Sequence, residues 1–253
     1  MPTIPCRYDG CCDFEPMTHN HVFCTEHNCK RKMENWKKRA ATPVPLEEDI
    51  FEAKFRRADA NSLRTEASNE WVLKNKRWGV LDIETTDLAA NFGTVVCACI
   101  KDVDGETTTF VTRGDSDFRT VKNLRDEIAK YDFIVTWYGT GFDIPFITTR
   151  WLIGGGKDVS FARHYDMYYT ARHRLRLHSN RLDCVQEALY GASAKTRLSP
   201  EWRLALRSVS PAKRRAAIEY HVEHCMIDVD ETKDLFLKLA PFKDLTATPQ
   251  RRY

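Results

Sequence analysis

Apolar residues gather in four short runs in the central part of the chain, and this pattern predicts a sheet. Each run is rich in β-branched or aromatic side chains, which favour extended backbone. The runs cover residues 77–83, 94–100, 107–112 and 131–137. Asp104-Gly105, between the second and third runs, is typical of a tight hairpin turn. Because a helical pattern over about 117–130 separates the third and fourth runs, we expect an α/β domain.

Helical patterns follow these strands and extend toward the C-terminus. We expect a helix to open at Asp143, after a glycine-bearing turn, and to end at glycines 154–156. A short strand then closes at Asp166, whose side chain we expect to cap the next helix. The last helix is predicted to begin near Pro211, a residue that suits the first helical position, and to continue to about Leu239.

The N-terminal part differs in composition, and it divides the chain into three predicted parts. Residues 1–30 are rich in cysteine, and residues 31–69 form a basic linker with one helix in the polar stretch 46–67. Residues 70–245 hold the α/β domain. With 253 residues, the chain is long enough for one domain of about 150 to 200 residues and a small appendage.

Two carboxylates lie at the end of the first predicted strand. Asp82 and Glu84 are two residues apart, so an extended backbone places both side chains on one face. Like charges this close resist ionising together and are costly to bury without a cation between them. The pair therefore predicts a metal site.

Further metal-ligating side chains occur downstream. Asp143 follows the fourth strand, and His224 and Asp228 are four residues apart in the last helix, so they share a face. His221, seven residues before Asp228, is a weaker candidate for the imidazole of this site. One helix can therefore deliver an imidazole and a carboxylate to the same place.

The order of these motifs resembles the DEDD (DnaQ-like) family of 3′ to 5′ exonucleases. The motifs are D-x-E in a strand, F-D after a glycine-bearing turn, and a helix with an imidazole before a final D-V. The stand-alone predicted 3′ to 5′ exonuclease or YprB-like branch is the most similar, over residues 76–240. This resemblance implies an RNase H-like fold, with a mixed central sheet flanked by helices.

The resemblance also implies a chemistry. Carried over by position, Asp82 and Glu84 match the first motif, Asp143 the second and Asp228 the third. Such enzymes hydrolyse phosphodiester bonds with two Mg²⁺ or Mn²⁺ ions about 3.5 to 4 Å apart. Oxygen ligands favour these ions over zinc. His224 would take the proton of the attacking water. The expected substrate is single-stranded DNA or RNA with a 3′ end.

One position departs from the family pattern. The third motif has either a tyrosine four residues before the aspartate or a histidine five residues before it. Here His224 occupies the tyrosine position, and Glu223 lies five residues before Asp228. The spacing is that of the tyrosine form but the residue is histidine, so this motif does not assign the subtype, whereas the predicted metal site is unaffected.

A basic segment predicts where a nucleic-acid strand binds. Residues 172–215 contain eleven Lys and Arg residues and three acidic residues, with aromatic rings between them. Cations for phosphates and rings for bases suit a strand-binding groove, although an exposed charged face explains each residue taken singly. The predicted substrate-binding residues, chosen mainly by the resemblance, are Thr85, Thr86, Phe142, Arg150, Ser179, Asn180, Arg181 and Lys195.

The first 30 residues predict a structural zinc site. Two ligand pairs are separated by twelve residues, and so short a segment without an apolar core needs a metal to fold. The predicted ligands are Cys6, Cys11, Cys24 and His27, and Cys12, Cys29, His19 or His21 could replace a neighbour. Such a module could touch nucleic acid, pack on its own domain or bind another protein.

Composition limits the remaining classes. No apolar run approaches the ~20 residues of a membrane span, and no signal-peptide pattern opens the chain. The cysteines outside the N-terminal segment, Cys97, Cys99, Cys184 and Cys225, are scattered in apolar stretches, which favours reduced thiols and a cytoplasmic protein. The alternative function is a nucleic-acid-binding or adaptor protein whose nuclease-like domain is not catalytic.

Overall fold

The computed structural model describes residues 4–5, 13–14, 47–158, 160–194, 206, 208 and 210–246. It divides the chain into two compact units, residues 1–61 and 62–253. In the first unit, β1 (Ile4–Pro5) and β2 (Asp13–Phe14) pair antiparallel. The predicted zinc ligands Cys6, Cys11, Cys24 and His27 lie outside the described residues, as does Lys195.

Helix α2 (Glu47–Asn75) begins in the first unit and ends in the second. It is longer than the predicted helix, because the apolar residues of its last turns pack within the core of the second unit. Val72 is buried there in a core cluster, and Leu73 packs against the same cluster. Asn69 Nδ2 donates to the carbonyl oxygens of Ala240 at 3.0 Å and Lys243 at 2.7 Å. Sequence periodicity alone did not reveal these contacts with the C-terminal residues.

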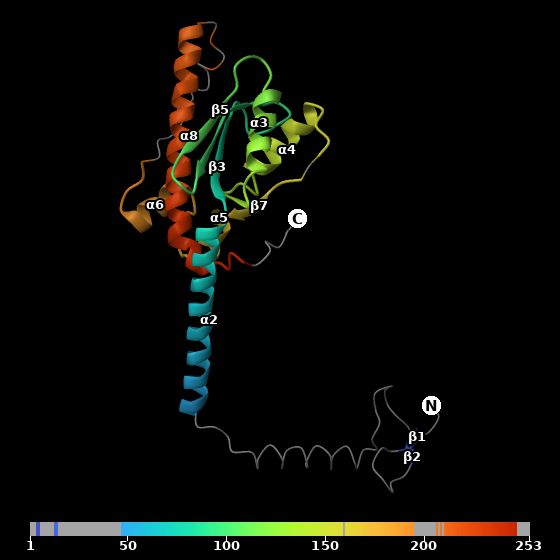
Figure 1. The fold of residues 1–253 in the computed structure, drawn as a ribbon, viewed down its shortest axis with the longest axis vertical. Helices are drawn as coiled ribbons and strands as arrows, with labels where there is room; N and C mark the ends of the chain where they lie inside the picture. Colours follow the sequence, from blue (N-terminus) through green and yellow to red (C-terminus); the bar gives the residue numbers. More distant parts are fainter. Residues whose placement is uncertain are drawn as a thin grey trace. The chain divides into compact units, whose positions relative to one another are not determined.

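A five-stranded mixed sheet forms the centre of the second unit, in the order β5-β4-β3-β6-β7 (Figure 1). Strands β3, β4 and β5 are antiparallel neighbours, whereas β6 and β7 extend the sheet in parallel with β3. The strands are β3 (Trp78–Thr85), β4 (Val95–Asp102), β5 (Thr107–Val111), β6 (Phe133–Thr136) and β7 (Arg163–Asp166). The predicted α/β class with a mixed sheet is therefore confirmed.

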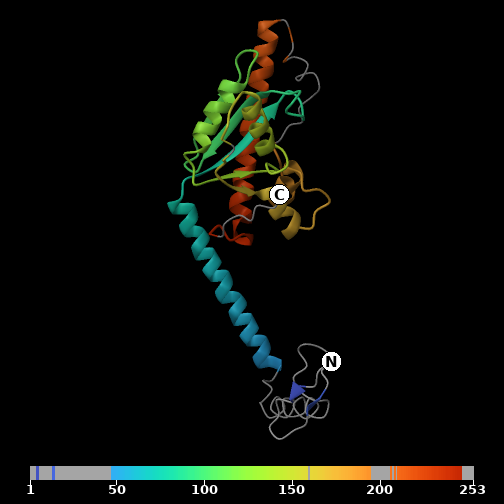
Figure 2. The same ribbon diagram turned by 90° about the vertical axis from the view of Figure 1, so that its right-hand side faces the viewer.

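Helices cover both faces of this sheet (Figures 1 and 2). Helices α3 (Phe118–Ile128) and α4 (Asp143–Ile153) bury one face, where Leu81 and Ile83 of β3 join their core cluster. The long helix α8 (Pro211–Leu239) lies on the other face, against Val80. Two shorter helices, α5 (Met167–Arg174) and α6 (Leu182–Tyr190), pack on α8. The alternation along β3 thus decides which side chains face which helix.

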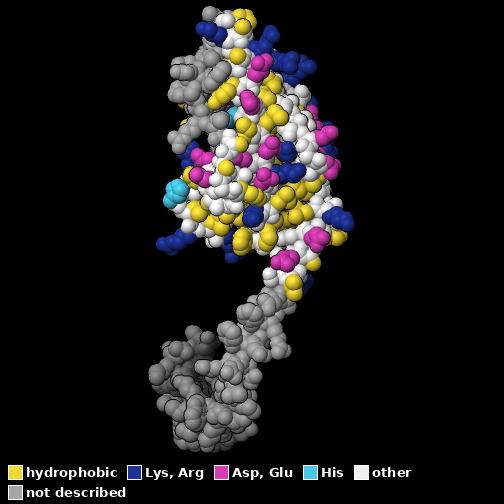
Figure 3. All heavy atoms as spheres, turned by 90° about the vertical axis from the view of Figure 1, so that its left-hand side faces the viewer, with side chains coloured by type: hydrophobic (Ala, Val, Ile, Leu, Met, Phe, Trp, Pro, Cys, Tyr) yellow, Lys and Arg dark blue, Asp and Glu magenta, His cyan; other side chains and the backbone are white. Residues whose placement is uncertain are grey.

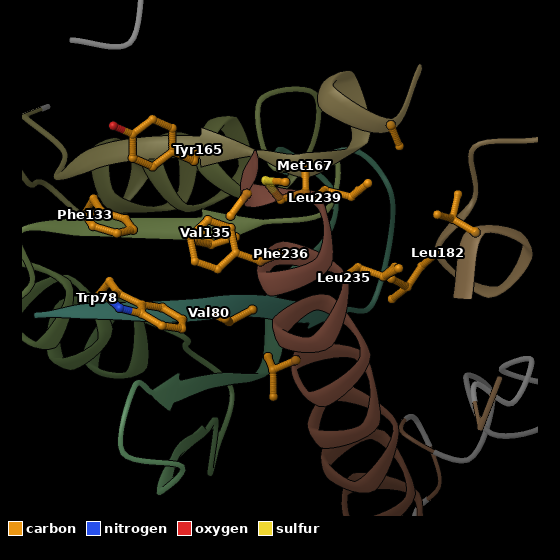
Figure 4. Close-up of a cluster of buried hydrophobic side chains, with 14 of the residues drawn as sticks. Trp78, Val80, Phe133, Val135, Tyr165, Met167, Leu182, Leu235, Phe236 and Leu239 are labelled. Carbon is orange, nitrogen blue, oxygen red and sulfur yellow. The ribbon is translucent and has the colours of Figure 1, made fainter. Parts of the chain in front are cut away.

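The core on the α8 side is rich in aromatic rings, as Figure 4 shows. Trp78 stacks on Phe133 and meets the edge of Phe236 from α8, with ring centroids 6.2 Å and 5.0 Å apart. Close ring contacts of this kind add to the apolar area that α8 buries. They fix the rotation of α8 about its axis and so determine which of its residues reach the end of β3.

The start of α8 agrees with the sequence. Ser210 Oγ accepts from Lys213 N at 3.5 Å, and Pro211 occupies the first turn.

Among the described residues, no helix combines the length and the apolar character needed to cross a membrane.

Candidate metal centre

Strand β3 brings Asp82 and Glu84 to the face covered by α8. Their partners across the β3–β4 ladder are Cys99 and Cys97, which belong to the core cluster on that face. The register of the ladder shifts between Glu84 and Thr85, and such irregularities re-aim side chains at the end of a strand. Both carboxylates are half-buried.

Helix α8 adds His224 and Asp228 at this point. Both side chains are buried, at 4% and 5% exposure. Ligand atoms of Glu84, His224 and Asp228 all lie within 4.8 Å of one another. Divalent ions bind oxygen or nitrogen at about 2.0 to 2.6 Å, so two ligands of one ion are separated by up to about 5 Å. The three groups therefore fit around a single cation.

Asp143 lies in the first turn of α4, beside the same strand end. Its side chain is buried, and Oδ1 accepts from Ile83 N at 3.2 Å. The pKa of Asp143 is raised from its ordinary value to about 7: burial is the largest cause and the negative charges of Asp166 and Asp228 add to it, while backbone hydrogen bonds from Asp143 and Ile83 oppose it. The charge of Asp228 thus acts on Asp143 although the two come from opposite faces of the sheet.

Asp166 stabilises the turn that precedes Asp143. Its Oδ1 accepts from Tyr168 N at 3.1 Å, so the predicted N-cap of α5 is confirmed. The same carboxylate also accepts from Tyr138 N and Thr140 N, each at 2.9 Å. It therefore holds the turn that leads from β6 into α4 and positions Asp143.

A thiol links α8 to the strand that carries the acids. Cys225 Sγ donates to the carbonyl oxygen of Asp82 at 3.3 Å. Burial raises the pKa of the Cys225 thiol well above its usual value, with contributions from Cys97, Cys99 and the charge of Asp82. The thiol therefore stays protonated and can donate. Cys225 is a free cysteine, as expected from the sequence, and so are the other three cysteines of the second unit.

His221 does not join the metal-ligating group. Its ring is fully buried, and Nδ1 lies 2.7 Å from the carbonyl oxygen of Ala217, one turn earlier in α8. His224 instead stacks against Tyr220, with ring centroids 6.4 Å apart. Of the two imidazoles considered from sequence, the structure places His224 with Glu84 and Asp228.

The guanidinium of Arg150, a predicted substrate-binding group, holds two protein segments together. Nε and Nη2 donate to the two oxygens of Asp117 at 2.9 and 2.8 Å, and Nη1 donates to the carbonyl oxygen of Ala90 at 3.1 Å. Asp117 is 1% exposed and also accepts from Val95 N at 2.9 Å. These contacts give Arg150 a structural role, and its contact with substrate stays a prediction.

The other predicted substrate-binding residues lie in three segments. At the end of β3, Thr85 Oγ1 donates to Asp87 O at 2.7 Å, and the next residue, Thr86, accepts through Oγ1 from Thr94 N at 2.9 Å. Before α4, the ring of Phe142 packs on Phe146, with centroids 5.5 Å apart.

The third segment leads into α6. Ser179 Oγ accepts from Arg181 N at 3.3 Å, and the carbonyl oxygen of Asn180 accepts from Trp137 Nε1 at 3.1 Å. Arg181 is exposed and pairs with Asp183 at 3.5 Å. The bond from Trp137 ties this segment to the end of β6, close to the turn before Asp143.

A groove of about 1220 Å³ lies on another side of α8, between this helix and the ends of β4 and β5. Figure 3 shows the side of the molecule that carries α8, where hydrophobic side chains lie among acidic and basic ones. Thr86, Arg113, Arg214, Val222 and Met226 are among the residues that line the groove. None of the predicted metal ligands is among the residues that line it.

Some residues around the centre carried no usable signal in the sequence. Asp117 and Cys225 gain their roles only through partners distant in the chain. Tyr138 has a positive φ of 67°, which the tyrosine side chain does not suggest. The two glycines that follow it were the only local hint of an unusual turn.

The comparisons with known proteins agree with this architecture. A model of the RNase H superfamily matches residues 80–240, which is more than half of the chain. Among solved structures, the chain is similar to the family B DNA polymerase from the hyperthermophilic archaeon Pyrobaculum calidifontis, with a TM-score of 0.50 and 23% identity. That similarity covers 65% of this chain but only 24% of the polymerase chain, and at this identity it concerns the fold alone.

No curated protein sequence matches the chain. The match to the superfamily model spans all five strands except the first two residues of β3, and it includes Asp82, Glu84, Asp143, His224 and Asp228. The chain belongs to the RNase H superfamily.

Proposed function

We propose that this protein is a metal-dependent 3′ to 5′ exonuclease that hydrolyses phosphodiester bonds in single-stranded DNA or RNA. The observation that carries the proposal is the convergence of Glu84, His224 and Asp228 within 4.8 Å, from a strand and a helix distant in the chain. Membership of the RNase H superfamily supports a nuclease-type function. The order of the acidic motifs, which resembles the DEDD family, supports the exonuclease assignment.

The donor set fits hard divalent cations. Asp82, Glu84, Asp143 and Asp228 would hold Mg²⁺ or Mn²⁺, because these ions prefer carboxylate oxygen. Bound ions of this kind lower the pKa of the attacking water and stabilise the departing oxygen. The raised pKa of Asp143 also fits, since a nearby cation favours the ionised form that burial alone disfavours.

The protein's own groups have distinct tasks in this proposal. The imidazole of His224 lies within 4.8 Å of the carboxylates of Glu84 and Asp228 and stacks on Tyr220; in this proposal it accepts the proton of the attacking water instead of binding an ion. Asp166 fixes the turn before α4 and so keeps Asp143 at the end of β3. Cys225 holds the backbone of Asp82 against α8.

The test is cleavage of a 5′-labelled single strand with Mg²⁺, with Mn²⁺ and with a chelator. We expect Asp228→Asn to reduce the rate at least about 100-fold, because it removes a ligand charge that no neighbour replaces. Asp234→Asn is the matched control, since Asp234 is exposed on the same helix. Thermal unfolding of both variants shows whether the fold is intact.

The product ladder tests direction and mode. A ladder of 5′-labelled strands that shorten one nucleotide at a time from the 3′ end agrees with the proposal. Cleavage of a circular strand, which has no 3′ end, contradicts the exonuclease part. If the folded Asp228→Asn variant cleaves at the wild-type rate, the metal centre is wrongly assigned. Binding of the strand without any metal-dependent cleavage favours the non-catalytic alternative.

We also propose that the protein is cytoplasmic and that its N-terminal segment binds one structural Zn²⁺. The free thiols of Cys97, Cys99 and Cys225 suit a reducing compartment. The zinc proposal rests on ligand spacing alone. Metal analysis of the purified protein tests it: one equivalent of zinc is expected, and its loss in Cys6→Ser would identify the ligand.

A further inference from the structure

Tyr138 has an unusual backbone conformation. Among the described residues it is the only one other than glycine with a positive φ, at 67°. The conformation is held from both sides: Tyr138 N and Thr140 N each donate to Asp166 at 2.9 Å. Strained residues that the surroundings hold in place occur mainly at functional sites.

The turn presents the Tyr138 ring on the surface. The ring packs so closely over Gly141 that a Cβ there would lie 2.4 Å from the ring. Its edge meets Tyr168 of α5, with centroids 4.9 Å apart, and Tyr169 lies next to it at 6.3 Å. Even with these contacts, Tyr138 is 44% exposed. The result is an aromatic surface made of Tyr138, Tyr168 and Tyr169, in which the Tyr138 ring rests on Gly141.

This surface lies directly beside the candidate metal centre. The carbonyl oxygen of Tyr138 accepts from Gly141 N at 2.9 Å and from Phe142 N at 3.1 Å, so one tight turn separates the ring from Asp143. Asp166 contacts the backbone of Tyr138, and its charge acts on Asp143. Tyr138 and Asp143 therefore lie at the two ends of one short turn.

Cationic residues continue from the same surface. Helix α5 carries Tyr168 and Tyr169 and then the exposed Arg172 and Arg174. Arg172 is four residues after Tyr168 and shares its face of the helix. An exposed ring followed by arginines is the arrangement that binds a single strand, because bases stack on rings while phosphates attract guanidinium groups.

We propose that Tyr138 stacks on a base of the nucleic-acid strand close to the scissile phosphate, and that Arg172 and Arg174 attract the phosphates beyond it. This inference rests on the proposed function for its ligand, although binding does not require cleavage. Stacking on an aromatic face tolerates any base, so Tyr138 supplies affinity and positioning without selecting a sequence.

The experiment is strand binding by fluorescence anisotropy in Ca²⁺, with dye-labelled oligothymidylate and oligouridylate of about 12 nucleotides. Tyr138→Asn removes the ring and retains the backbone conformation, because asparagine tolerates a positive φ. We expect this variant to weaken binding roughly 5- to 100-fold, from the usual contribution of one base stack. Tyr138→Phe, which keeps the ring, should restore the affinity.

A strand with abasic 3′-terminal positions distinguishes stacking from a general loss of structure. Wild-type protein should bind it as weakly as Tyr138→Asn binds the normal strand, and the variant should lose little more. If Tyr138→Asn weakens binding of the normal and the abasic strand by the same factor, the proposal is overturned. Wild-type affinity in a folded Tyr138→Asn variant would overturn it as well. Because the readout is binding, the stacking proposal survives even if the protein proves to lack nuclease activity.

Discussion

The ion pair between Arg150 and Asp117 allows a sharp test of what Arg150 does. The two side chains share two hydrogen bonds at 2.8 and 2.9 Å, and their exposures are 14% and 1%. Replacing Arg150 by Met keeps most of the apolar stem but leaves the Asp117 carboxylate buried without its cation. Removing one partner of a buried pair costs about 3 to 5 kcal/mol.

This cost should appear as a lower unfolding temperature. In a domain of this size, 1 kcal/mol corresponds to about 2 to 4 °C, so Arg150→Met should unfold about 6 to 20 °C below wild type. The second variant, Arg150→Met with Asp117→Asn, removes the uncompensated charge and can still accept from Val95 N. It should recover at least about 1 kcal/mol of the loss, because two neutral partners avoid the penalty of a buried charge.

The assays are thermal and urea unfolding of the metal-free proteins, each followed by circular dichroism, with cleavage kinetics measured in parallel. A large loss of stability, partly restored in the double variant, agrees with the structural role. If Arg150→Met has wild-type stability but a raised KM for the strand, the reasoning is refuted. Arg150 would then contact substrate, as the family resemblance implies.

Three further predictions concern the candidate metal centre and its support. The metal-free protein should lose stability as the pH rises from about 4 to 7, after which its stability should level off. The reason is that the folded state binds the Asp143 proton more tightly than the unfolded state, in which the pKa of this group is near 3.8. Urea unfolding at pH 5 and 8 checks this, and Asp143→Asn should remove this part of the pH dependence. Mn²⁺ should bind more tightly as the pH rises toward 7, by up to about tenfold per unit if Asp143 must release its proton; calorimetry that shows equal affinity at pH 5.5 and 7.5 would exclude Asp143 as a ligand. Asp166→Ala should cost about 2 to 4 kcal/mol and reduce cleavage, because the amides of Tyr138 and Thr140 lose their acceptor; a stable, fully active variant would contradict the positioning role.

Local patterns in the sequence determined the secondary structure and part of the candidate centre. Each apolar run became a strand within a few residues of its predicted limits, since side-chain alternation and β-branched content act over a few neighbours. The same local geometry explains why Asp82 and Glu84 share a strand face, and why His224 and Asp228 share a helix face. Asp166 and Pro211 were assigned correctly because helix starts depend on nearby backbone groups.

Only the tertiary structure decided which of these groups meet. The packing of α8 against Trp78 and Phe133 rotates the helix so that His224, and not His221, reaches Glu84. Asp117 at the start of α3 pairs with Arg150 of α4, and Asp166 accepts from the amide of Tyr138 in its strained conformation. These interactions join residues far apart in the chain, and their geometry depends on strand order and helix rotation. Short-range periodicity contains no information on either. The meeting of the acidic groups in one site was therefore predicted from the family resemblance and not from local patterns, and the contacts of Asp117 and Tyr138 were not predicted at all.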